Sequence, residues 1–134
     1  MNNNTPKRGY VYLIKEREFI KTGENIYKIG KTGQDKFKRF DQYPKGSCLI
    51  YYQQVNEYNK VESKIIERLK DKYKILKDIG REYFNGNLID ILLDIIKITQ
   101  NYTDGKMVDE SKKYLSDYYD KLESKLLSKE ILSK

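Results

Sequence analysis

Phenol and cationic side chains gather in the N-terminal third of this chain. Tyr10 and Tyr12 alternate with apolar residues, so in a β-strand both rings project from the same face. A second strand-like segment, residues 26–32, carries Lys28 and Lys31, and Arg39 follows nine residues after its glycine. Attack on a phosphodiester builds negative charge on the non-bridging oxygens, and cations beside the phosphate lower that barrier. These residue types could therefore support phosphodiester hydrolysis.

Histidine is absent from the chain, and Cys48 is its one cysteine. A Ser-His-Asp triad, a Cys-His pair and histidine-based metal motifs are therefore excluded, as is a cysteine-rich zinc site within one chain. Cys48 begins an apolar stretch and is interpreted as a small buried hydrophobic residue. If the chain is an enzyme, its general base must be a tyrosine, a lysine, a carboxylate or a metal-bound water.

The periodicity of apolar residues predicts the elements that would position these groups. Short runs rich in aromatic and β-branched residues, bounded by turn or polar segments, predict strands over residues 9–14, 26–32 and 48–55, the first two joined by a polar loop long enough for antiparallel pairing. Helical spacing predicts helices over residues 35–43, 60–76, 88–99 and 109–132. The expected fold is α+β, with a small three-stranded antiparallel sheet flanked by helices and a C-terminal helix.

The two C-terminal helices are expected to differ in burial. In residues 88–99 the only polar positions before the final threonine, Asp90, Asp94 and Lys97, fall on one stripe, so we expect this helix to be the most buried element. The last helix carries an apolar seam of Leu115, Tyr119, Leu122 and Leu126. That seam is expected either to dock back on the sheet or to form a homodimer. We therefore expect a domain over residues 1–99, followed over 100–134 by a linker and an amphipathic helix.

The order of these segments resembles the GIY-YIG nuclease superfamily, in particular its phage- and virus-associated branch with a Lys-Ile-Gly second motif. The resemblance covers Gly9 to about Asn87. The matching positions are Tyr12 in the first motif, Ile29-Gly30 at the end of the second, Arg39, Glu62, and the closing segment Gly80-Arg81-Glu82-Tyr83-Phe84. Better-known members carry a tyrosine where this chain has Lys28, and here Tyr27 stands one place earlier, on the opposite strand face.

The resemblance implies a metal-dependent DNA endonuclease. Glu62 would hold Mg²⁺ or Mn²⁺, Tyr12 would activate or orient the attacking water, and Arg39 would clamp the phosphate. Lys28 would stand close enough to Tyr12 to favour its phenolate. Residues expected to face the DNA are Tyr10, Tyr27, Lys31, Tyr43 and Asn85, although the tyrosines could instead simply cover the sheet.

Net charge is distributed unevenly along the chain. Residues 1–87 hold 19 Lys and Arg against 11 Asp and Glu, whereas residues 88–134 hold 8 against 9. This asymmetry favours a polyanionic partner such as DNA. The sequence shows no signal peptide and no apolar run of membrane-spanning length, so a soluble, cytoplasmic protein of a prokaryote, phage or virus-infected cell is expected.

Two other functions remain open from the sequence. One is a nucleic-acid-binding module that keeps the fold without the cleavage chemistry, which the lysine at position 28 would permit. The other is a restriction-type nuclease that uses Glu62 and Lys64 as a Glu-x-Lys motif. That motif requires a strand, whereas these residues lie in a segment with helical periodicity.

Overall fold

The computed structural model describes residues 7–132 apart from 34–39, 41, 77 and 81. Its strands are β1 (Gly9–Lys15), β2 (Ile26–Thr32), β3 (Cys48–Val55), β4 (Lys74–Ile75) and β5 (Tyr83–Asn85). Its helices are α1 (Arg17–Thr22), α2 (Tyr58–Lys72), α3 (Leu88–Thr99) and α4 (Gly105–Leu132), with a 3₁₀ turn at Gln100–Tyr102. Most of the helix predicted over residues 35–43, including Arg39, lies outside the described residues.

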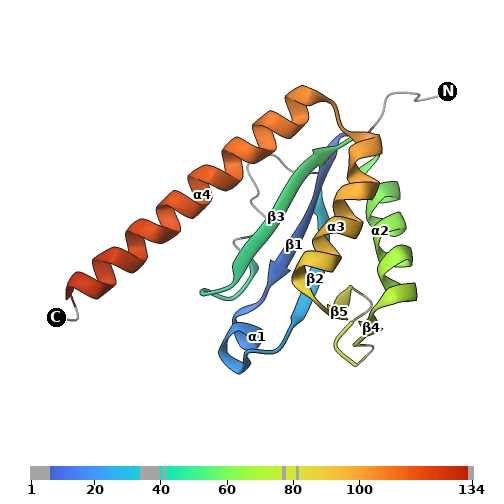
Figure 1. The fold of residues 1–134 in the computed structure, drawn as a ribbon. Helices are drawn as coiled ribbons and strands as arrows, with labels where there is room; N and C mark the ends of the chain where they lie inside the picture. The colour runs from blue at the N-terminus through green and yellow to red at the C-terminus, as the bar shows by residue number, and fades with distance from the viewer. Residues whose placement is uncertain (1–6, 34–39, 41, 77, 81, 133–134) are drawn as a thin grey trace.

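The sheet is antiparallel, with the strand order β3-β1-β2-β5-β4. The α+β class is confirmed, but the expectation of three strands was wrong, because β4 and β5 extend the sheet beyond β2 (Figure 1). These two strands have two and three residues, too few to show an alternating pattern. The short helix α1 was also missed, and α2 ends earlier than predicted because the chain turns into β4.

The register of β1 and β2 decides which side chains share a face. Tyr12 lies opposite Gly30, and Ile14 lies opposite Lys28, so Tyr12 and Lys28 project from the same face of the sheet. Val11, Leu13 and Ile29 project from the other face and form the main core with α2 and α3. The expected placement of Tyr12 and Lys28 on one face is confirmed.

The long helix α4 covers the exposed edge of β3 and then continues beyond the sheet (Figure 1). Its hydroxyl groups pair with backbone atoms of that edge. The Leu49 amide donates to the Tyr118 hydroxyl at 3.2 Å, and the Gln54 amide donates to Ser111 Oγ at 2.9 Å. The Tyr119 hydroxyl contacts the Ile50 carbonyl at 2.9 Å. The first half of α4 therefore docks back on its own sheet. Its hydroxyl groups satisfy backbone groups that an unpaired edge strand would otherwise expose.

The prediction that residues 88–99 form the most buried element was wrong, although the bounds of α3 were predicted correctly. Ile91 and Ile95 are fully buried against the sheet, but Ile89, Leu93 and Ile96 are exposed. Helix α3 packs on the sheet through one face and on α2 through a flank, and no described element covers its outer face. None of the described helices is both long enough and apolar enough to cross a membrane.

A buried carboxylate joins α3 to α2. Asp94, 3% exposed, accepts hydrogen bonds from Lys72 Nζ at 2.9 Å and the Tyr73 hydroxyl at 3.0 Å. Arg68 adds a longer ion pair at 3.6 Å. Burial alone would raise the pKa of Asp94, but these hydrogen bonds and positive charges outweigh it and hold the pKa below its ordinary value. Asp94 is therefore charged at neutral pH and ties the two helices together.

Asp94→Asn is expected to lower the free energy of unfolding by about 1–3 kcal/mol at neutral pH, because it removes the charge but keeps the shape. A carboxyl with a lowered folded pKa contributes stability above its unfolded pKa of about 4 and loses it as the pH falls through the folded value. The difference between the wild type and the variant should therefore shrink in acid. Denaturant titrations at neutral and acidic pH measure it, with the exposed Asp117→Asn as a control expected within about 0.5 kcal/mol of the wild type. A constant difference across this pH range would contradict the assignment.

Candidate functional site

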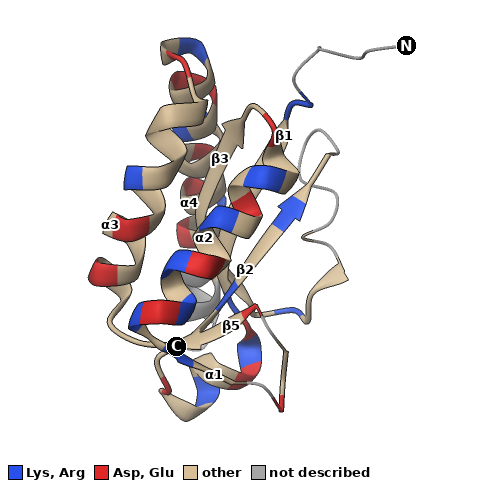
Figure 2. Cartoon of the chain, turned by 90° about the vertical axis from the view of Figure 1, so that its right-hand side faces the viewer, with Lys and Arg blue, Asp and Glu red and all other residues tan. Residues whose placement is uncertain are grey.

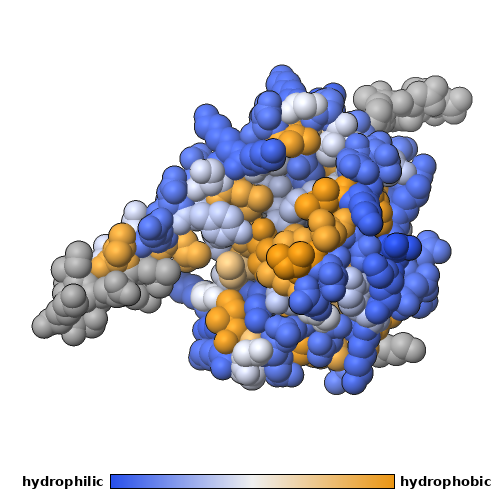
Figure 3. All heavy atoms as spheres, in the orientation of Figure 1, coloured by the Kyte–Doolittle hydropathy of each residue, from blue (hydrophilic) through white to orange (hydrophobic). Residues whose placement is uncertain are grey.

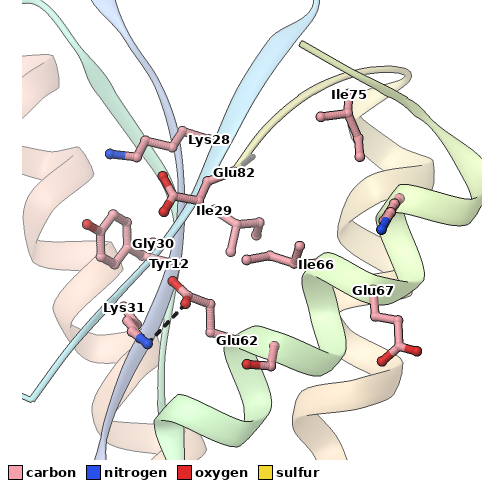
Figure 4. A pocket seen from close by; sticks show the side chains of 12 residues that line it. Tyr12, Lys28, Ile29, Gly30, Lys31, Glu62, Ile66, Glu67, Ile75 and Glu82 are labelled. Atoms are coloured by element: carbon pink, nitrogen blue, oxygen red, sulfur yellow. Dashed lines mark ion pairs between the residues drawn. The ribbon is translucent and has the colours of Figure 1, made fainter. Parts of the chain in front are cut away.

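A hollow of about 910 Å³ opens between α2 and the edge of β2. Strand β5 pairs with β2 only over Ile26 to Lys28, and the last contact is a 2.9 Å hydrogen bond from the Ile29 amide to the Glu82 carbonyl. Beyond that point no described strand pairs with this edge. The side chains that give the hollow its chemistry are Tyr12, Lys28, Lys31, Glu62 and Glu82 (Figure 4).

Tyr12 reaches the hollow from β1 by passing over Gly30 of β2. A Cβ at Gly30 would overlap the hydroxyl end of the Tyr12 ring, so only glycine permits this close approach. The ring is almost fully buried, and its hydroxyl lies 2.8 Å from the hydroxyl of Tyr43. Because Gly30 has no side chain, the phenol of Tyr12 can pass over it and line the hollow.

Glu62 enters the hollow from α2 and is only 8% exposed. Lys31 forms an ion pair with it at 3.3 Å, drawn as the dashed line in Figure 4. Burial raises the pKa of Glu62, and the charge of Glu82 adds to this increase, while Lys31 and Lys28 oppose it. The hollow therefore holds a buried carboxylate that is paired with Lys31, and Glu82 is close enough to influence its pKa.

Lys28 connects the phenols to this acidic side of the hollow. Its ammonium lies 4.9 Å from the centre of the Tyr43 ring and 5.6 Å from that of Tyr83, distances at which a cation is attracted to an aromatic face. Tyr43 in turn contacts the Tyr12 hydroxyl. A polar chain therefore runs from Lys28 through Tyr43 to Tyr12.

The structure thus brings four sequence-predicted residues together, Tyr12, Lys28, Lys31 and Glu62. Arg39 lies outside the described residues and remains a sequence-based prediction. Glu82 was not singled out as a site residue, although it belongs to the closing segment of the family resemblance. The family resemblance of that segment was the one sequence feature that pointed to Glu82. Its approach to Glu62 depends on the pairing of β5 with β2, which joins segments far apart in the sequence.

The residues predicted to face DNA are scattered. Tyr43 contacts Tyr12, whereas Tyr10 stacks on Tyr52 with ring centres 4.6 Å apart, on the sheet face that α4 covers. Tyr27 is 5% exposed in the core on the opposite face, so the structure does not place it on a DNA-facing surface. Its pKa is raised by burial. Asn85 is exposed but pairs with Ile26 at the far end of β2 from Gly30.

The donors in the hollow suit a hard divalent cation that keeps much of its water. Among the described residues, no three His, Cys, Asp or Glu side chains gather into a metal-binding group. Mg²⁺ dehydrates reluctantly and is commonly bound through one or two carboxylates together with phosphate oxygens. Glu62 and Glu82 both line the hollow and offer two such carboxylates.

A family model described as the T5orf172 domain matches residues 9–100. Because this match covers more than half of the chain, the chain belongs to the T5orf172 domain family, a phage T5-associated domain. No curated protein and no solved structure matches the chain.

Proposed function

We propose that this chain is a metal-dependent DNA endonuclease of the GIY-YIG type, with its chemistry in the hollow beside β2. One observation carries the proposal: a phenol from β1, two ammonium groups from β2 and a buried carboxylate from α2 line a single hollow, beside a second carboxylate. These groups come from four separate segments, and packing of the core does not by itself require them to converge.

Lys28 and Lys31 would hold a phosphate of the bound strand. Lys31 lies on the part of β2 that no described strand pairs on this side, and Lys28 lies at the last position paired with β5, so both line the hollow where a polyanion can approach without disturbing the sheet. As DNA binds, Lys31 would exchange part of its ion pair with Glu62 for the phosphate. That exchange would leave the Glu62 carboxylate available beside the scissile group.

Tyr12 would take the proton from the attacking water. The Tyr43 hydroxyl can donate a hydrogen bond to the Tyr12 oxygen, which stabilises the phenolate, and the ammonium of Lys28 over the Tyr43 ring adds positive charge. Glu62 and Glu82 would hold Mg²⁺ or Mn²⁺, whose chemistry is to stabilise the negative charge that develops on phosphate oxygens. Arg39 would clamp the phosphate if it lies where the family resemblance implies.

A non-catalytic DNA-binding module of the same fold is the second candidate. The observation that favours it is the ion pair between Lys31 and Glu62, which neutralises the expected metal ligand. The test is incubation of the purified protein with supercoiled plasmid in Mg²⁺, in Mn²⁺ and in EDTA. Conversion to nicked or linear DNA with either metal, blocked by EDTA, supports the endonuclease. Binding without conversion at any metal concentration would support the module.

DNA affinity is expected to fall steeply with salt. Figure 2 shows Lys and Arg residues along β2 and α2, interspersed with acidic residues. Lysine and arginine bind nucleic acid mainly through its phosphates, so these contacts should be dominated by phosphates. The logarithm of affinity for duplex DNA should fall with the logarithm of salt by about 0.9 for each phosphate neutralised. Lys28→Met and Lys31→Met should each reduce this slope by about 1, measured by fluorescence anisotropy.

The matched control for that titration is Lys97→Met, an exposed cation on α3 that does not line the hollow. It should leave the slope unchanged. If Lys97→Met reduced the slope as much as Lys31→Met, the DNA-binding surface would not be the edge of β2.

A further inference from the structure

Helix α3 presents an apolar stripe on its outer face. Ile89, Leu93 and Ile96 are 63%, 52% and 43% exposed, and their spacing of four and then three residues places them in one line along the helix. Figure 3 shows hydrophobic residues gathered over α3 on this side of the molecule. The same spacing forms the contact seam when two helices pack side by side.

Two opposite charges flank this stripe on the same side. Asp90 and Lys97 are both exposed and lie seven residues apart, nearly two full turns, so they project in almost the same direction. Asp90 stands at the N-terminal end of the stripe and Lys97 at its C-terminal end. The stripe therefore has an acidic corner and a basic corner along one flank.

The outer face of α3 is complementary to the same face of a second copy that runs in the opposite direction. If two α3 helices pack antiparallel about a two-fold axis through Leu93, Ile89 of each copy meets Ile96 of the other. Asp90 of each copy then lies beside Lys97 of the other, which gives two ion pairs. A parallel pair would instead place the charged flanks of the two copies on opposite sides of the seam, so neither ion pair would form. The charges thus favour a second copy of this chain, in antiparallel orientation.

We propose that the chain self-associates through the outer face of α3, as an antiparallel α3–α3 pair. The seam has only three apolar side chains per copy. The area that they can bury is smaller than the roughly 800 Å² per partner of a standard interface, so the dimer should be weak and depend on concentration. No α3 residue lines the hollow, so the paired face and the hollow are formed by different residues. The proposal is therefore independent of the proposed nuclease activity.

Sedimentation equilibrium of the full chain without DNA, over a wide concentration range, tests the pairing. The wild type should show a monomer–dimer equilibrium, and Leu93→Glu should be monomeric throughout. Leu127→Glu, at an equally exposed leucine on α4, is the matched control and should dimerise like the wild type. Circular dichroism and thermal unfolding would establish that each variant is folded, as expected for substitutions at exposed helical positions.

Charge reversal tests the orientation. Asp90→Lys and Lys97→Glu should each weaken the dimer, because each opposes like charges across the pair, and the two together should restore it. A wild type that stays monomeric, or a dimer unaffected by Leu93→Glu, would overturn the proposal. Loss of the dimer in Leu127→Glu would move the interface to α4, and a double reversal that fails to restore association would overturn the antiparallel arrangement.

Discussion

Glu62→Gln is expected to bind DNA as tightly as the wild type and to lose cleavage by about 10²–10³-fold. The amide keeps the size and position of the side chain but removes the negative charge that would hold Mg²⁺ or Mn²⁺. DNA affinity should survive, because it depends on cations at the edge of β2 and not on this buried carboxylate. Single-turnover cleavage of a labelled duplex, at DNA concentrations where both proteins are saturated, separates the two properties.

Glu67→Gln is the matched control for this variant. Glu67 lies on α2 and lines the same hollow, but its side chain is exposed and it forms no described ion pair. It should cleave at nearly the wild-type rate. Equal rates for Glu62→Gln and the wild type would remove Glu62 from the mechanism.

Tyr12→Phe is expected to lower the cleavage rate by about 10²–10⁴-fold, the usual contribution of a positioned general base. The ring still fills its buried position over Gly30, so the fold should persist with the loss of about 1 kcal/mol for the hydrogen bond to Tyr43. Lys28→Met should lower the rate as well, because the phenolate loses its nearby cation. Pre-steady-state rates and thermal unfolding measure the two effects separately.

Tyr27→Phe is the control for Tyr12→Phe. Tyr27 is also a buried tyrosine, on the adjacent strand, but its ring lies in the core on the opposite face of the sheet. The loss of its hydroxyl should leave the cleavage rate unchanged. The assignment fails if Tyr27→Phe is inactive while Tyr12→Phe cleaves normally.

The parts of the fold that could be predicted from sequence are those specified by local patterns. The two-residue period of a β-strand predicts which side chains of residues 9–14 and 26–32 share a face, and the pairing of Tyr12 with Gly30 agrees with that prediction. Asn87 caps α3 through the amide of Asp90, so the start of this helix could be predicted from one residue. These signals lie within a few residues of the features that they specify.

The remaining features depend on contacts between distant segments. Strands β4 and β5 exist because β2 offers an edge for pairing, and their few residues carry no alternating pattern of their own. The burial of Tyr27 and the approach of Glu82 to Glu62 follow from that pairing. The burial of α3 was predicted wrongly because the sequence does not distinguish an apolar residue that faces the core from one that lies exposed on the surface.

The central claim is that cleavage takes place in the hollow beside β2, and reversible blocking of that hollow tests it most directly. Ser63 lies on α2 at the rim of the hollow, with an exposed side chain, so Ser63→Cys in a Cys48→Ala background offers a single reactive thiol. Asp117→Cys, exposed on α4 and outside the hollow, is the control.

The measurement is the rate of plasmid cleavage after attachment of a bulky disulfide-linked group, and again after its removal with a reducing agent. We predict that the modified Ser63→Cys protein is inactive, that reduction restores its rate, and that the modified Asp117→Cys protein is unaffected. Cleavage by the modified Ser63→Cys protein at its unmodified rate would contradict the account.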